Sequence, residues 1–116
     1  MSLDKRDASI LQKIVKYCAD IDKTNEVFGS SQEELKNNNV YMNALAMCIL
    51  QIGELTTHLS LEFINAYTDI PWKDIRGMRN VAAHHYGDFS PKYLWQTIED
   101  DIPILRQFCE ERLLEP

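Results

Sequence analysis

The stretch that decides the fold is residues 40–63, VYMNALAMCILQIGELTTHLSLEF. Its apolar residues recur every three or four positions, which is the repeat of one face of an α-helix. The residues on this face are Tyr41, Leu45, Cys48, Ile52, Leu55, Leu59 and Phe63. The spacing predicts one long helix over residues 40–67 that buries this face in a core.

A second helix is predicted on the N-terminal side of this stretch. Asp4 is a candidate N-cap and Gly29 a candidate C-terminal stop for a helix over residues 5–28. Ser31 and Glu34 then have the spacing of a capping box, which predicts a short helical turn. The asparagines at 37–39 are expected to end that turn.

Two further helices are predicted on the C-terminal side. Pro71 suits the first turn of a helix that continues to about His85, and Ser90 followed by Pro91 suits the start of the last helix. Pro103 lies inside the last helix and is expected to kink or split it near Asp101. No segment alternates with the two-residue period of a strand, so the prediction is an all-α fold.

Length and composition set limits on this fold. A chain of 116 residues predicts a single domain over 1–116, an up-and-down four-helix bundle with a short extra helical turn. The longest apolar run, residues 44–50, is too short to span a membrane, and the N-terminus has no apolar signal region, so a cytoplasmic protein is expected. Cys18, Cys48 and Cys109 are widely spaced, which predicts buried free thiols.

One segment does not have the pattern of a scaffold. Residues 72–86, WKDIRGMRNVAAHHY, place three Lys or Arg ahead of two His and a Tyr. Arginine holds phosphate oxygens and histidine exchanges protons near neutral pH, so the segment suits chemistry at a phosphodiester. Metal-dependent cleavage needs clustered carboxylates, but only Asp74 lies in this segment and Asp88 in the turn that follows it. The residues therefore favour a metal-free acid–base reaction.

The geometry of a helix constrains this site. Asn80 and His84 share a face, while Arg79 lies about 140° around the helix from His84. Arg79 could curl around, the helix could end before His84, or two copies of the helix could meet across a dimer axis. We favour the dimer. The plain alternative is that these are solvated side chains on the surface of an amphipathic helix.

The sequence resembles the HepT-like family of the HEPN superfamily of helical ribonucleases. The resemblance spans nearly the whole chain in the order of the family's blocks, which are residues 52–54, 70–72, 75–80, 84–86, 94–98 and 101–105. It implies a homodimeric ribonuclease toxin subunit of a type II toxin–antitoxin pair that cuts RNA without a metal or cofactor. Arg79, His84 and Tyr86 match the family motif Arg-x4-His-x-Tyr.

The resemblance also implies roles for single residues. His84 would move a proton and Arg79 would hold the phosphate, in a cleft between subunits, with Asn80, Arg76 and His85 in support. The competing register is Arg79-x5-His85, which places Tyr86 directly after the histidine. Glu54 is expected to serve a helix N-terminus or an arginine across the bundle, in a structural role. His58 is expected to be a satisfied or exposed helix residue, and Trp72 and Trp95 to lie in the core or an interface.

The resemblance implies a protein partner as well. In this family the partner is a nucleotidyltransferase antitoxin, which would adenylylate Tyr86. The alternative function is a non-enzymatic helical module that binds a nucleotidyltransferase or a nucleotide. The net charge of −6 argues against general binding of nucleic acid. The charge is uneven, however, because residues 99–115 hold six acids and residues 72–86 only one, which predicts a narrow, local RNA site.

Overall fold

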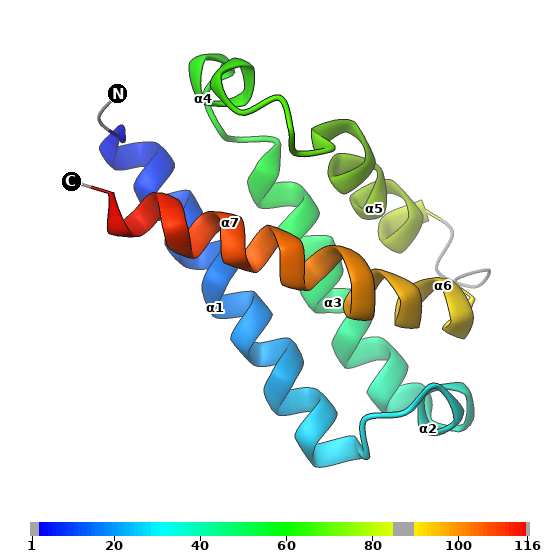
Figure 1. Ribbon diagram of the computed structural model, residues 1–116. Coiled ribbons are helices and arrows are strands. Elements are labelled where there is room, and N and C mark those ends of the chain that lie inside the picture. The colour runs from blue at the N-terminus through cyan, green and yellow to red at the C-terminus, as the bar shows by residue number, and fades with distance from the viewer. Residues whose placement is uncertain (1–2, 85–89, 116) are drawn as a thin grey trace.

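The computed structural model describes residues 3–84 and 90–115, and within these residues the chain is helical without any strand (Figure 1). The elements are α1 (Lys5–Phe28), α2 (Gln32–Asn37), α3 (Asn39–Thr56), α4 (Leu61–Ala66), α5 (Trp72–His84), α6 (Pro91–Gln96), a π-helical segment η2 (Thr97–Asp101) and α7 (Ile102–Leu114). The predicted all-α class is confirmed. None of the described helices is long and apolar enough to cross a membrane.

The predicted helix ends at the N-terminal side are confirmed. Asp4 caps α1 by accepting a hydrogen bond from the backbone N–H of Arg6 at 2.6 Å. Gly29 ends that helix with φ 108°, a left-handed conformation that a residue with a Cβ rarely adopts. Ser31 caps α2 through a bond from the N–H of Glu34 at 3.1 Å. Each cap involves residues close in sequence, which is why the pattern predicts it.

The single long helix predicted over residues 40–67 is wrong. α3 ends at Thr56, where the hydroxyls of Thr56 and Thr57 donate to the carbonyls three residues earlier at 2.7 and 2.6 Å. Ser60 then starts α4 by accepting from the N–H of Phe63 at 3.1 Å. Leu59 and Phe63 are buried despite the break. The apolar spacing therefore continues through a turn that the helical period alone does not predict.

The predicted interruption of the last helix is confirmed. α6 begins at Pro91 after the cap Ser90, and α7 begins at Ile102, with η2 between them. The N–H of Ile102 donates to the carbonyl of Thr97, five residues back. Pro103 has no N–H and its ring crowds the preceding turn, so a wider π turn lets the chain continue as a helix.

The longer helices pack around one core of buried apolar side chains. α1 lies against α3 and α7 (Figure 1), and α3 packs most extensively against α5. The three cysteines are free and buried, one on each of α1, α3 and α7, which confirms that prediction. Because α3 contacts both α1 and α5, it connects the core to the helix that carries the candidate site.

Candidate functional site

The N-terminus of α5 is held by a cluster of aromatic rings, Phe63, Tyr67, Trp72 and Phe108. Neighbouring ring centroids in this aromatic cluster lie 4.9–6.1 Å apart. The indole Nε1 of Trp72 also donates to the carbonyl of Tyr67 at 2.8 Å. The ring contacts and this bond fix the first residue of α5 against α4 and α7, and they confirm that Trp72 is a core residue. Trp95 is partly buried against the core.

The middle of α5 lies directly on α3 at Gly53. A Cβ atom at this position would stand 2.8 Å from the Cβ of Arg79 and 3.0 Å from its backbone nitrogen. Only glycine allows two helix backbones to approach so closely. The contact fixes the backbone of Arg79 beside the residue that follows Gly53, which is Glu54.

Glu54 connects Arg79 to His58. Its Oε2 accepts a hydrogen bond from NH1 of Arg79 at 2.8 Å, and its Oε1 lies 3.3 Å from Nε2 of His58. The side chains of Glu54 and Arg79 are 43% and 38% exposed, so solvent reaches the pair. The expectation that Glu54 serves an arginine across the fold is confirmed. His58 lies in the turn after α3 and not within a helix, which corrects the prediction for that residue.

The same contacts set the charge of Glu54. The hydrogen bond from Arg79 lowers the pKa of Glu54 below its ordinary value, although desolvation opposes the shift. The charge of Arg79 and the contact with His58 lower the pKa further. Glu54 is therefore ionised at neutral pH, and the Arg79–Glu54 contact is an ion pair.

The remaining predicted site residues lie on or after α5. Arg76 is one turn before Arg79 and half-buried, and its Nε is enclosed without a hydrogen-bond partner among the residues that the structure describes. Asn80 and His84 are within α5, so the helix does not end before His84. The structure describes the backbone of these two residues and not their side chains. His85 and Tyr86 lie outside the described residues.

The side of α5 that faces α6, η2 and α7 is apolar and acidic. A cavity of about 140 Å³ lies between α5 and the C-terminal helices, lined by Ile75, Met78, Tyr93 and Ile104 among others. Asp74 and Asp101 also line it. Burial, and then the charges of Asp100 and Asp74, raise the pKa of Asp101. This side of α5 therefore repels a phosphate, unlike the side that carries Arg79.

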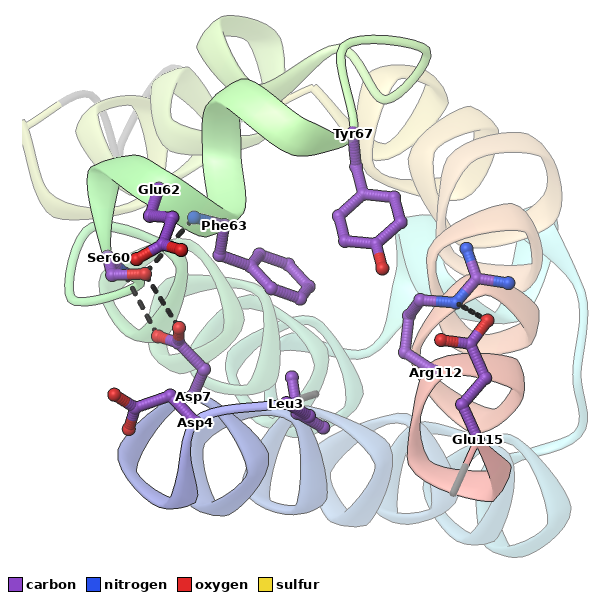
Figure 2. Close-up of a pocket in the computed structure, with 9 residues that line it drawn as sticks. All are labelled: Leu3, Asp4, Asp7, Ser60, Glu62, Phe63, Tyr67, Arg112 and Glu115. Carbon is purple, nitrogen blue, oxygen red and sulfur yellow. Dashed lines mark hydrogen bonds and ion pairs between the residues drawn. The ribbon is translucent and has the colours of Figure 1, made fainter. Parts of the chain in front are cut away.

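A larger cavity of about 240 Å³ lies where α1, α4 and α7 meet (Figure 2). Asp7 projects from α1 and accepts from the backbone N–H and the hydroxyl of Ser60, at 2.9 and 2.7 Å. Arg112 lies over the ring of Tyr67, 5.1 Å from its centroid, and contacts Glu115 at 2.9 Å. None of the described lining residues comes from α5, and these pairs connect helix ends, so we interpret this cavity as structural.

Metal-binding side chains are sparse in the described part of the chain. Among the described side chains, which do not include those of residues 80–89, no three His, Cys, Asp or Glu gather in a group that could hold a metal ion. Arg79 pairs with Glu54, which also contacts His58. The arrangement suits the binding of an anion next to α5, with Arg79 as the cation.

The comparison with family models places the chain in a ribonuclease family. The model described as "Ribonuclease HepT-like" matches residues 12–112, which include α3, α5 and most of α7. The chain therefore belongs to the HepT-like ribonuclease family.

Individual relatives agree with this assignment. The chain is 33% identical over 87 residues to "Putative RNase TTE0752" of Caldanaerobacter subterraneus subsp. tengcongensis, covering 75% of this chain and 78% of that protein. It is 29% identical over 110 residues to "Putative RNase MJ1216" of Methanocaldococcus jannaschii, covering 94% and 89%. It is 33% identical over 55 residues to "Probable ribonuclease HepT" of Thermococcus cleftensis, covering 47% and 50%. The comparison with solved structures gave no significant match.

The sequence predicts an arginine as one of two possible partners for Glu54, but it does not identify that arginine as Arg79. The pairing of Glu54 with Arg79 joins residues 25 positions apart, and no local period connects them. The available signal was the Gly53–Glu54 pair, because a glycine in an apolar helix followed by an acid marks a close helix contact beside a charge.

Proposed function

We propose that this protein is a metal-independent endoribonuclease, the toxin subunit of a type II toxin–antitoxin system. The observation that carries the proposal is the placement of Arg79 on α5, partly exposed and paired with Glu54, five residues before His84. Membership of the HepT-like ribonuclease family supports it. RNA is the expected substrate because a ribose 2′-hydroxyl supplies the nucleophile.

The proposed reaction is a transfer within the RNA backbone. His84 takes the proton of a 2′-hydroxyl, and the 2′ oxygen attacks the adjacent phosphorus. The bond to the 5′ oxygen breaks, this oxygen takes a proton from water, and the protonated His84 returns its proton to the solvent. The products are a 2′,3′-cyclic phosphate and a 5′-hydroxyl. Arg79 stabilises the charge that develops on the phosphate oxygens in the transition state.

The proposed site is formed by two protomers, each an up-and-down four-helix bundle. Positions 79 and 84 lie in one continuous helix and are separated by about 140° around its axis. A phosphate therefore meets Arg79 of one copy and His84 of the other more easily than both residues of a single copy. Asn80 and Arg76 would support the same cleft, and His85 is the alternative proton carrier.

The direct test is cleavage of a labelled single-stranded RNA. Wild type is expected to cut it in the presence of EDTA, while Arg79→Ala and His84→Ala are expected to lose at least about a hundredfold in rate. His85→Ala is the matched control and keeps its activity if His84 is the proton carrier. Equal cleavage by wild type, Arg79→Ala and His84→Ala would exclude the proposed site.

Mixing the two inactive variants tests whether the site is shared. After unfolding and refolding together, Arg79→Ala and His84→Ala form mixed dimers that hold one intact site if Arg79 and His84 act across the interface. Random pairing then restores about a quarter of wild-type activity. Activity that stays at the level of the separate variants would place both residues in the same protomer.

Regulation is proposed to act on Tyr86. A nucleotidyltransferase antitoxin would transfer AMP from ATP to the Tyr86 hydroxyl with release of pyrophosphate. The added negative charge and bulk, two residues from His84, would repel an RNA phosphate. With the partner and ATP, wild type and Tyr93→Phe are expected to gain the mass of AMP, and Tyr86→Phe is not. The same gain in Tyr86→Phe would place the acceptor elsewhere.

A further inference from the structure

Arg79 is fixed at both ends of its side chain. Its backbone lies against Gly53, where a Cβ atom would come within 2.8 Å of the Cβ of Arg79. Its guanidinium NH1 donates to Oε2 of Glu54 at 2.8 Å. Two consecutive residues of α3 therefore hold Arg79: Gly53 fixes the position of its backbone, and Glu54 fixes the position of its guanidinium.

The Arg79–Glu54 pair contributes little to the stability of the fold. Both side chains are more than a third exposed, and ion pairs with such access to water stabilise a protein weakly. Glu54 also places a negative charge where the proposed function requires an RNA phosphate to approach. A carboxylate in this position weakens RNA binding, so its benefit has to come from another effect.

That effect is the restriction that Glu54 places on the conformations of the Arg79 side chain. An arginine side chain has about 2 kcal/mol of rotamer entropy, part of which is lost when it closes on a phosphate. A side chain already held by Glu54 has lost this freedom before RNA binds. Because arginine carries five N–H donors, one bond to Glu54 is compatible with a bidentate bond to a phosphate. The second carboxylate oxygen of Glu54 faces His58, which restricts the carboxylate in turn.

We propose that Glu54 is a positioning residue for Arg79 in RNA cleavage, held in place by the Gly53 contact and by His58. The inference rests on the proposed ribonuclease function. Glu54 does not touch the RNA in this scheme. It lowers affinity for RNA by its charge and raises turnover by ordering the arginine that stabilises the transition state.

The test separates charge from position by comparing two substitutions. Glu54→Gln and Glu54→Ala both remove the charge, but only the glutamine keeps an oxygen that accepts from Arg79. Both are expected to bind the 2′-O-methyl form of the RNA about two- to fivefold more tightly than wild type, to the same extent. The kcat is expected to fall about tenfold in Glu54→Gln and further in Glu54→Ala. Glu33→Gln, in α2 before the start of α3, is the matched control and changes neither.

Three kinetic outcomes would overturn the inference. Values of kcat and Kd equal to those of Glu33→Gln would mean that Glu54 has no role in the reaction. A rise in kcat would mean that Glu54 restrains Arg79 instead of positioning it. A lower kcat with an unchanged Kd and a lower Tm would mean that Glu54 acts through the fold.

A second measurement does not depend on cleavage. The Nε–Hε signal of Arg79 in a ¹⁵N NMR spectrum, assigned with Arg79→Lys, is expected to be resolved and slow to exchange in wild type and averaged in Glu54→Ala. The same signal in both proteins would overturn the positioning role. If wild type cuts no RNA, the proposed function fails, while this signal still decides whether Glu54 orders Arg79.

Discussion

At the scale of single residues, the buried carboxylate of Asp7 joins two distant parts of the chain. It joins the first turn of α1 to the start of α4 through two hydrogen bonds to Ser60, a residue 53 positions away. Asp7 is almost fully buried, so its bonds to Ser60 are shielded from bulk solvent.

Asp7→Ala is expected to lower the free energy of unfolding by about 2–3 kcal/mol, because it leaves the N–H and hydroxyl of Ser60 without their acceptor. Asp4→Ala is the matched control, since it removes an exposed N-cap three residues earlier and should cost about 1 kcal/mol. Urea denaturation measures both. A loss in Asp7→Ala no larger than in Asp4→Ala would contradict the assigned role.

At the scale of helices, the sequence predicts those features that depend on near neighbours. The caps at Asp4, Ser31 and Ser90 involve bonds to residues two or three positions on, and they fall where the pattern places them. The pattern does not predict the turn between α3 and α4, because Ser60 is held by Asp7 from another helix. In the site, Arg79 was predicted from its motif, whereas its pairing with Glu54 required the packing of α5 on α3.

The contact between α3 and α5 is expected to tolerate no side chain at Gly53. Gly53→Ala forces the two backbones apart and should cost about 1–3 kcal/mol of stability. Gly77→Ala, in α5 itself, is the matched control, because its Cβ would meet no described atom within 4 Å. It should stabilise the helix by about 0.5–1 kcal/mol. Opposite changes in Tm confirm the close contact, and equal changes would contradict it.

At the scale of the whole molecule, acids and cations are partly paired on the surface of the helices. Arg106 of α7 contacts Asp22 of α1 as well as Glu110, and Arg112 contacts Glu115. The net charge of −6 therefore includes carboxylates that already have a cation nearby. For the proposed function, the excess of acid outside α5 would limit nonspecific binding of RNA and would concentrate attraction for a phosphate near Arg79.

The thiols of the core give a prediction for pH. Burial raises the pKa of Cys18 and Cys109 to about 12 and that of Cys48 to about 11, from 9.0. At pH 8 the folded protein should not react with a thiol reagent such as DTNB, while the protein unfolded in guanidinium should show all 3 thiols. Fast reaction of the folded protein would contradict the burial of these residues.

The same pKa shifts mean that the free energy of unfolding falls at alkaline pH. Because the folded thiols stay protonated where unfolded ones ionise, their contribution to stability is complete below about pH 9 and is lost as pH rises toward 11–12. Each thiol lowers the free energy of unfolding by up to about 1.4 kcal/mol per pH unit in that range. Urea midpoints between pH 8 and 11 measure the fall, and Cys48→Ala should reduce its slope above pH 9.

The fluorescence of Trp72, in the aromatic cluster at the start of α5, can report on local unfolding of that helix. The indole of Trp72 is buried and bonded to a carbonyl, and it lies at the first residue of the helix that carries Arg79. In a Trp95→Phe background its fluorescence isolates this one place in the chain. A red shift in emission would then report that the start of α5 has left the core, before the rest of the helices unfold.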